Sequence, residues 1–239
     1  MPDRLEGHTF RRFDGELDHL HTEILEMMAL VFSQIQNAIE SFQPQKQKTV
    51  YDIIEKEVRV NLLEKKIDSS IMEVLAKRGA VARDLRAIMG FSKMVTDLER
   101  LGDEAARITQ ISTKIYSKEY SSQDTGMLRE IDIIGKHACA MLQEMIAVLK
   151  TLDSKRARKL LRRAGINEAF NASLRRLTTY VLEDTLKMKY VINIILILKS
   201  LERIDAHARN LAEYVIYIVS GDDIRHAEDN RQDADNKAR

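Results

Sequence analysis

Apolar residues recur every three or four positions along this chain, in runs of about thirty residues. Steps of three and four place such side chains on one stripe of an α-helix. The chain of 239 residues has only 2 Pro and 9 Gly to interrupt these runs, whereas a β-sandwich needs turn residues at roughly every tenth position. We therefore expect an all-α protein. The stripe of the first run comprises Leu17, Leu20, Ile24, Met28, Val31, Ile35, Ala38 and Phe42.

Breaks in the apolar pattern divide the chain into six long helices. We expect Gly79 and Gly221 to end the second and the sixth helix, and Asp153 or Ser154 to cap the fifth, which contains Gly165. The fourth helix follows the polar segment 117–126 and ends near 152. The other five helices are expected at about 17–42, 49–78, 81–118, 154–183 and 186–220.

An internal repeat relates the two halves of the chain. The segments DLERLGDEAARITQIS at 97–112 and SLERIDAHARNLAEYV at 200–215 align with their apolar residues in register. Each segment lies in the third helix of its half, and a single helix cannot bury its apolar stripe alone. We therefore expect a tandem repeat of two three-helix bundles, at 1–120 and 121–221. The charged tail at 222–239 is expected to be disordered.

Composition excludes several classes of protein. The chain has 38 basic and 37 acidic residues, which argues against a dedicated nucleic-acid binder. The single Cys139 excludes an internal disulfide framework and a cysteine-based zinc site. The most apolar stretch, 190–198, is far shorter than the roughly 20 residues that a membrane-spanning helix needs. We expect a soluble, cytoplasmic protein without a signal segment.

Two groups of oxygen-bearing side chains in the first repeat each contain a pair of residues four apart on one helix, Glu99 with Asp103 and Glu57 with Asn61. Residues four apart project from one face, and like charges there repel unless a cation or a metal ion compensates them. Carboxylate and amide oxygens are hard ligands suited to Mg, Mn, Ca or iron. A solvated acidic face is the alternative on spacing alone. The groups are Asp97, Glu99 and Asp103 on the third helix, and Glu57, Asn61 and Glu64 on the second.

The segments 81–108 (VARDLRAIMGFSKMVTDLERLGDEAARI) and 200–226 (SLERIDAHARNLAEYVIYIVSGDDIRH) resemble the paired signatures of the PhoU family of phosphate-uptake regulators. HTFRRFDGELDHL at 8–20 and VNLLEKKID at 60–68 are similar to that family as well. The resemblance implies two three-helix bundles with acidic motifs that bind multinuclear iron or zinc clusters. It also implies a cytoplasmic, homodimeric protein that restrains the phosphate-starvation response beside the phosphate ABC transporter and its sensor kinase.

The resemblance carries over to the two repeats unequally. In the first repeat it implies a metal site for iron or zinc, or for Mg or Mn, formed by Glu57, Asn61, Glu99 and Asp103. In the second repeat Glu202 is kept, and Asp205, three residues on, is a weaker candidate ligand. The remaining ligand positions hold Ala206, Arg163 and Asn167, so the second site is expected to be weakened or absent. These departures suggest a divergent paralogue.

A basic run opens the fifth expected helix. An acidic partner or a phosphate-bearing ligand would suit it, and a solvated face is the simpler alternative. No flanking aromatic residues or recognition-helix pattern favour nucleic acid. No Gly-rich phosphate loop or nucleotide fingerprint occurs, so no motif predicts direct phosphate binding. The run comprises Lys155, Arg156, Arg158, Lys159, Arg162 and Arg163.

Taken together, the sequence predicts a non-enzymatic regulator of phosphate uptake and phosphate-starvation signalling. Its expected partners are the transporter ATPase, the sensor histidine kinase and a second copy of the chain, with no nucleic acid and with membrane contact only through those partners. One alternative is a carboxylate-bridged metal enzyme, but the chain offers a single Glu-x-x-His pair, Glu16 and His19, where such sites use two. The sequence also leaves open a DNA-binding repressor and a helical scaffold without a ligand.

Overall fold

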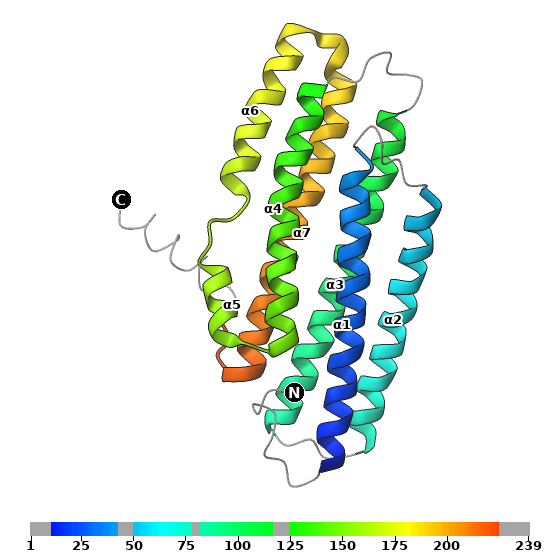
Figure 1. Cartoon of the computed structure of the whole chain (residues 1–239), viewed down its shortest axis with the longest axis vertical. Coiled ribbons are helices and arrows are strands. Elements are labelled where there is room, and N and C mark those ends of the chain that lie inside the picture. Colours follow the sequence, from blue (N-terminus) through cyan, green and yellow to red (C-terminus); the bar gives the residue numbers. More distant parts are fainter. Residues whose placement is uncertain (1–10, 43–49, 78–81, 117–124, 225–239) are drawn as a thin grey trace.

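A computed structural model describes residues 11–42, 50–77, 82–116 and 125–224, and every regular element within those ranges is helical (Figure 1). The prediction of an all-α protein is confirmed. The helices are α1 (Arg11–Glu40), α2 (Val50–Lys77), α3 (Ala82–Ile115), α4 (Thr125–Thr151), α5 (Ser154–Leu161), α6 (Asn167–Glu183) and α7 (Met188–Ser220), with a 3-10 turn, η1 (Thr185–Lys187), before α7.

The helices form one elongated bundle. In Figure 1, α2 lies along one long edge and α5 and α6 along the other, with α1, α3, α4 and α7 between them. The helices α1, α2 and α3 pack on one another, and α7 packs on α4, α5 and α6. The contacts of α3 with α7 and of α1 with α4 join the two halves. A single hydrophobic core therefore runs through both repeats.

The expected fifth helix is in fact two helices, so the prediction of six helices is wrong. The chain leaves helical conformation after Leu161 and resumes it at Asn167, with Gly165 in the break. Leu160 and Ile166, six residues apart, would lie about 120° apart around one continuous helix. In the structure both are buried, at 2% and 3% exposure. The break lets both side chains reach the core, and the low helix propensity of glycine makes it inexpensive.

The expected helix ends are largely confirmed where the structure describes them. Asp153 caps α5 by accepting hydrogen bonds from the backbone N–H groups of Lys155 and Arg156, at 2.9 and 3.1 Å. Gly221 ends α7 in the left-handed conformation, with φ of 81° and its N–H donated to the Tyr217 carbonyl. A side chain would be strained there. Gly79 lies outside the described residues.

The predicted apolar stripe of the first helix is buried at every position, from Leu17 on α1 to Phe42, which lies just beyond the end of α1. The long central helices approach each other closely at Gly90, where a β-carbon would lie 2.4 Å from Cγ1 of Ile218 on α7. Among the described helices, none is long and apolar enough to cross a membrane. The expected disordered tail lies outside the described residues beyond its first three, 222–224.

Candidate functional site

Five candidate ligands of the first repeat form an acidic cluster between α2 and α3. They are Glu57, Asn61, Glu64, Glu99 and Asp103. Val60 of α2, 1% exposed, packs into the core between these helices, which holds the neighbouring polar positions of α2 near α3. Glu57 and Glu64 on α2 and Glu99 on α3 are half-buried. The other two side chains of this acidic cluster, Asn61 and Asp103, are exposed.

Electrostatic coupling shows that four of these carboxylates are neighbours. Burial raises the pKa of Glu57, and the charge of Asp103 raises it further. Burial also raises the pKa of Glu64, with added contributions from Asp68 and Asp103 against a smaller opposite effect of Lys65. The charge of Asp103 therefore acts on both acids of α2.

Glu99 has the most strongly coupled environment of the cluster. Burial is the largest cause of its raised pKa, followed by the charges of Asp103 and Glu64, while Arg100 opposes the shift. A hydrogen bond with Asp103 adds to the increase. Asp103 is thus the common neighbour of Glu57, Glu64 and Glu99, and like-charge repulsion accumulates around it.

The chemistry of this acidic cluster suits a hard cation, because carboxylate and amide oxygens are its only donors and their mutual repulsion would be relieved by positive charge. The side chains are not gathered into a ready-made cage. Within the described residues, no group of three or more His, Cys, Asp or Glu side chains is arranged to hold a metal ion. The two helices are in place, and the ligands Glu57, Asn61, Glu99 and Asp103 would have to converge by rotation of their side chains.

Two other acids of α3 face α7 instead. Asp97, the third acid considered with Glu99 and Asp103, is buried. Its Oδ1 lies 2.7 Å from Nδ1 of His207 and accepts a longer hydrogen bond from Asn210. Glu104 accepts a hydrogen bond from Arg203 at 2.9 Å. These four acids of α3 therefore divide between the acidic cluster and the contact that joins the two repeats.

In the second repeat both candidate carboxylates already have cationic partners. Glu202 forms an ion pair with Lys199 on the preceding turn of α7. Asp205 accepts a hydrogen bond from Nε of Arg209 at 2.9 Å, and its side chain is only 11% exposed. Ala206, at the position equivalent to Asp103, offers no ligand. The charge that would attract a metal ion is neutralised here by the protein itself.

The basic run lies on α5 and on the break that follows. Arg156 and Arg163 both pair with Glu144 of α4, at 3.2 and 3.7 Å, and Arg158 pairs with Asp222. The other three side chains are exposed and have no ion-pair or hydrogen-bond partner within the described part of the chain. They are Lys155, Lys159 and Arg162.

The sequence patterns did not single out the cations of α7 that pair with the candidate acids. Lys199 and Arg209 lie three and four residues from the acids with which they pair, and that spacing is a recognisable signal on a helix. Arg203 pairs across to α3, which spacing along one helix cannot reveal.

Comparison with known proteins gives matches that extend over most of the chain. The family model described as "PhoU domain" matches this chain twice, over residues 12–112 and 131–215. A phosphate-specific transport system accessory protein PhoU homolog of Pseudomonas aeruginosa is 34% identical over 225 residues, which cover 94% of this chain and 92% of that protein. The phosphate-specific transport system accessory protein PhoU of Escherichia coli K12 is 29% identical, with coverage of 93% and 91%.

Solved structures show the same similarity. The crystal structure of PhoU from Pseudomonas aeruginosa superimposes with a TM-score of 0.80 at 33% identity, covering 88% of this chain and all of that one. The phosphate transport system regulatory protein PhoU from Streptococcus pneumoniae gives a TM-score of 0.76 at 20% identity, with coverage of 88% and 98%. At that identity the second likeness shows the fold.

Proposed function

The chain belongs to the PhoU family, and we propose on that premise that it is a regulator of phosphate uptake and of phosphate-starvation signalling. The observation that carries the proposal is the extent of the similarity, because the family model matches both halves of the chain. Relatives that cover more than nine-tenths of this chain are named as accessory proteins of the phosphate-specific transport system. We propose that it acts in the cytoplasm by contact with other proteins rather than by catalysis.

The proposed partners are the ATPase of the phosphate ABC transporter, the phosphate sensor histidine kinase and a second copy of this chain. The exposed lysines of α5 support an acidic partner surface, because their charge is not neutralised within the described residues. Reversing Lys155 and Lys159 to Glu should then weaken capture of the ATPase or the kinase, as added salt should. Reversal of Lys136, which pairs with Asp132 on α4, provides a control of equal charge change per residue. Equal recovery of all variants at low salt would leave these lysines as solvated side chains.

We further propose a metal site at the acidic cluster, formed by Glu57, Asn61, Glu99 and Asp103. The nearby charge of Asp103 supports it: burial is the larger cause of the raised pKa values of Glu57 and Glu99, and the charge of Asp103 adds a repulsion that a bound cation would relieve. Iron, zinc, Mg or Mn held there would supply positive charge that ties α2 to α3. The role of the ion would be structural or sensory, since the cluster contains no nucleophile and no histidine.

Deletion of the gene tests the proposed function. Loss of a restraining regulator should raise expression from phosphate-starvation promoters when phosphate is plentiful, and a plasmid copy should restore repression. An unchanged reporter in a strain without a second family member would contradict the proposal. A plasmid copy carrying Glu99→Ala with Asp103→Ala separates regulation from metal binding, because it tests whether the acidic cluster is needed for repression.

A further inference from the structure

A cavity of about 600 Å³ lies where α5 ends, α6 begins and both face α7. Its size falls within the roughly 300–1,000 Å³ typical of small-molecule sites. Two carboxylates line it, Glu202 and Asp205, against five cationic side chains, for a net charge of +3. The cations are Arg162, Arg163, Lys199, Arg203 and Arg209.

Arg209 gives this cavity a fixed wall. Its guanidinium donates to Asp205 and also to the carbonyl oxygens of Leu161 and Arg163, at 3.2 and 3.1 Å. Those carbonyls belong to the end of α5 and to the break behind it, where a helix has no partners for them. One side chain therefore holds the broken segment against α7 and keeps the cavity in shape.

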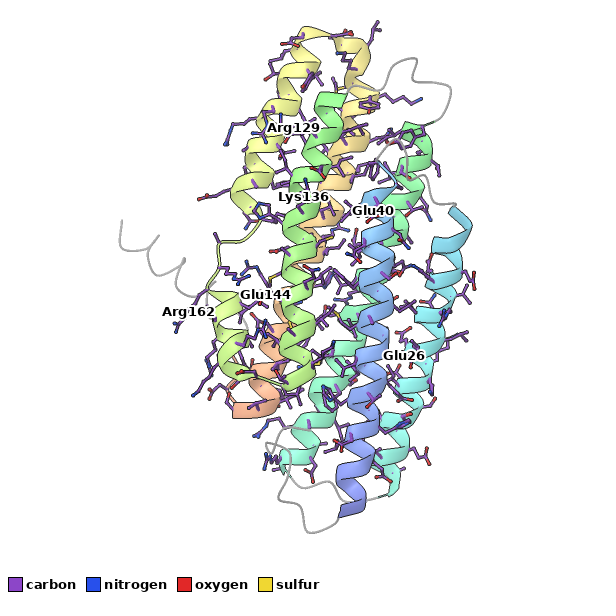
Figure 2. The ribbon with its side chains drawn as sticks, viewed as in Figure 1. Glu26, Glu40, Arg129, Lys136, Glu144 and Arg162 are labelled. Carbon is purple, nitrogen blue, oxygen red and sulfur yellow. The ribbon has the colours of Figure 1, made fainter. Side chains whose placement is uncertain are left out.

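The acidic partners of the other cations do not neutralise all of their positive charge. Arg203 pairs with Glu104 outside the cavity, and Arg163 shares Glu144 with Arg156 at a loose 3.7 Å. The side chain of Arg162 has no partner within the described residues. Figure 2 labels Arg162 at the end of α5 and Glu144 on α4. A cavity of this kind attracts an anion.

The start of α6 lies at the same place and has no side-chain cap. Ile166 occupies the N-cap position and makes no side-chain hydrogen bond to the first turn. Ile166 and Asn167 both line the cavity, so the backbone N–H groups that open α6 lie beside it. Free N–H groups at a helix start favour negative charge, although Glu168 in the first turn offsets part of that effect.

We propose that this cavity binds a small anion that carries phosphate groups. Arginine recognises phosphate oxygens through paired hydrogen bonds, and the cavity brings four arginines and a lysine to one place. Free orthophosphate and the phosphate groups of a nucleotide share this chemistry. The proposal goes beyond the regulatory function and does not depend on it, since binding is measured on the purified chain.

Calorimetric titration of the metal-free full-length chain with orthophosphate and, separately, with ATP tests the proposal at constant ionic strength. The key variant is Arg162→Glu, because this exposed side chain lines the cavity without holding it together. Lys159→Glu is the matched control, since it reverses one exposed charge on α5 outside the cavity lining. Circular dichroism and melting temperature show that each variant is folded.

At least one of the two probes should bind, and Arg162→Glu should weaken that binding by about tenfold or more, the usual effect of losing a hydrogen bond to a charged group. Lys159→Glu should change it by less than about twofold, as expected of an exposed charge outside the site. Binding of orthophosphate would identify the free anion as sufficient, and binding of ATP alone would identify a larger phosphate-bearing ligand. The proposal is wrong if neither probe binds at millimolar concentration, or if both variants weaken binding equally.

Discussion

The third helices of the two repeats, α3 and α7, each pack against the other helices of their own repeat and against each other. They differ in whether the charges of their candidate acidic ligands are neutralised. Of four pairs of positions separated by 103 residues, one is identical and three differ. Glu99 matches Glu202, Gly102 matches Asp205, Asp103 matches Ala206, and Ala106 matches Arg209. In α3 Glu99 and Asp103 repel each other beside α2, whereas in α7 Glu202 and Asp205 each have a cation on their own helix. Three substitutions along one helix face therefore change the charge that the two repeats present.

The helices that pack against α3 and α7 in their own repeats also differ, in continuity and in charge. α2 continues unbroken for 28 residues and brings Glu57 and Glu64 to the acidic cluster. Its counterpart in the second repeat breaks between α5 and α6 and brings Arg162 and Arg163 to a cavity. An intact helix positions acidic side chains at regular spacing, and a broken one opens space for a ligand. A stable break needs its own anchors, and these should be sensitive to mutation.

Arg209→Ala should have the largest effect on stability. It leaves Asp205 largely buried without its partner and removes donors from the carbonyls of Leu161 and Arg163. Loss of one member of such a pair costs about 3 kcal/mol of unfolding free energy. Arg107→Ala, an exposed arginine of α3 in the other repeat, should cost less than about 0.5 kcal/mol. Urea unfolding measures both, and equal midpoints would remove Arg209 as the anchor of the break.

Arg176→Ala should have the second largest effect, because it removes the ion pair that joins Arg176 of α6 to Glu130 of α4. Although burial alone would raise the pKa of Glu130, hydrogen bonds from Arg176 and Ser173, and the charge of Arg176, hold it below the ordinary value. Glu130 is 5% exposed. Removing Arg176 therefore leaves its carboxylate buried, and of the two side chains that donate to it only Ser173 is left.

We expect a loss of about 2 kcal/mol for Arg176→Ala, since half of the Arg176 side chain is exposed and the vacated space admits water. Arg175→Ala is the adjacent exposed control, and its urea midpoint should stay near that of the original chain. Because the folded pKa of Glu130 is depressed, its contribution to stability is present above the unfolded value of 4.5 and is lost as pH falls through the folded value. The effect of Arg176→Ala should therefore shrink in acid, and a pH-independent difference would contradict the ion pair.

Glu99→Gln should have the smallest effect, and in the opposite direction. The raised pKa of Glu99 means that its contribution to stability is present below 4.5 and is lost as pH rises through the folded value. With a chelator present at pH 7, removing this charge should raise the melting temperature by about 1–2 °C, and the gain should vanish near pH 4.

Glu202→Gln is the control for Glu99→Gln in the second repeat, where Lys199 already neutralises the carboxylate. It should give no increase in melting temperature at either pH. An equal gain from both variants would mean that the two acids have the same environment, and the contrast between the repeats would fail at this position.

The fold could be predicted in outline because it rests on local periodicity. The stripe from Leu17 to Phe42 and the cap at Gly221 are patterns of neighbouring residues, and both are confirmed. The break between α5 and α6 could not be predicted, since Gly165 inside a helical pattern is a weak signal. What decides the break is burial of Ile166 and the bond from Arg209, which lies 48 residues away from Leu161.

The candidate site shows the same division between local and distant information. Spacing grouped Glu99 with Asp103, and their electrostatic coupling agrees with that grouping. Asp97 lies two positions before Glu99 and so projects from another side of the helix, where it pairs with His207 on the other repeat, a partner that spacing along one helix cannot identify. The cavity beside α7 gathers its cations from α7 and from the break that follows α5, so no contiguous motif could reveal it.

Metal content measured on protein purified without a histidine tag tests the contrast between the repeats most directly. The account predicts metal bound at one site per chain, lost in the double variant Glu99→Ala with Asp103→Ala and retained in Glu202→Ala. The metal-dependent rise in melting temperature should disappear with the same double variant and persist in Glu202→Ala. Metal that survives the double variant and is lost with Glu202→Ala would contradict the account, because the second repeat would then hold the working site.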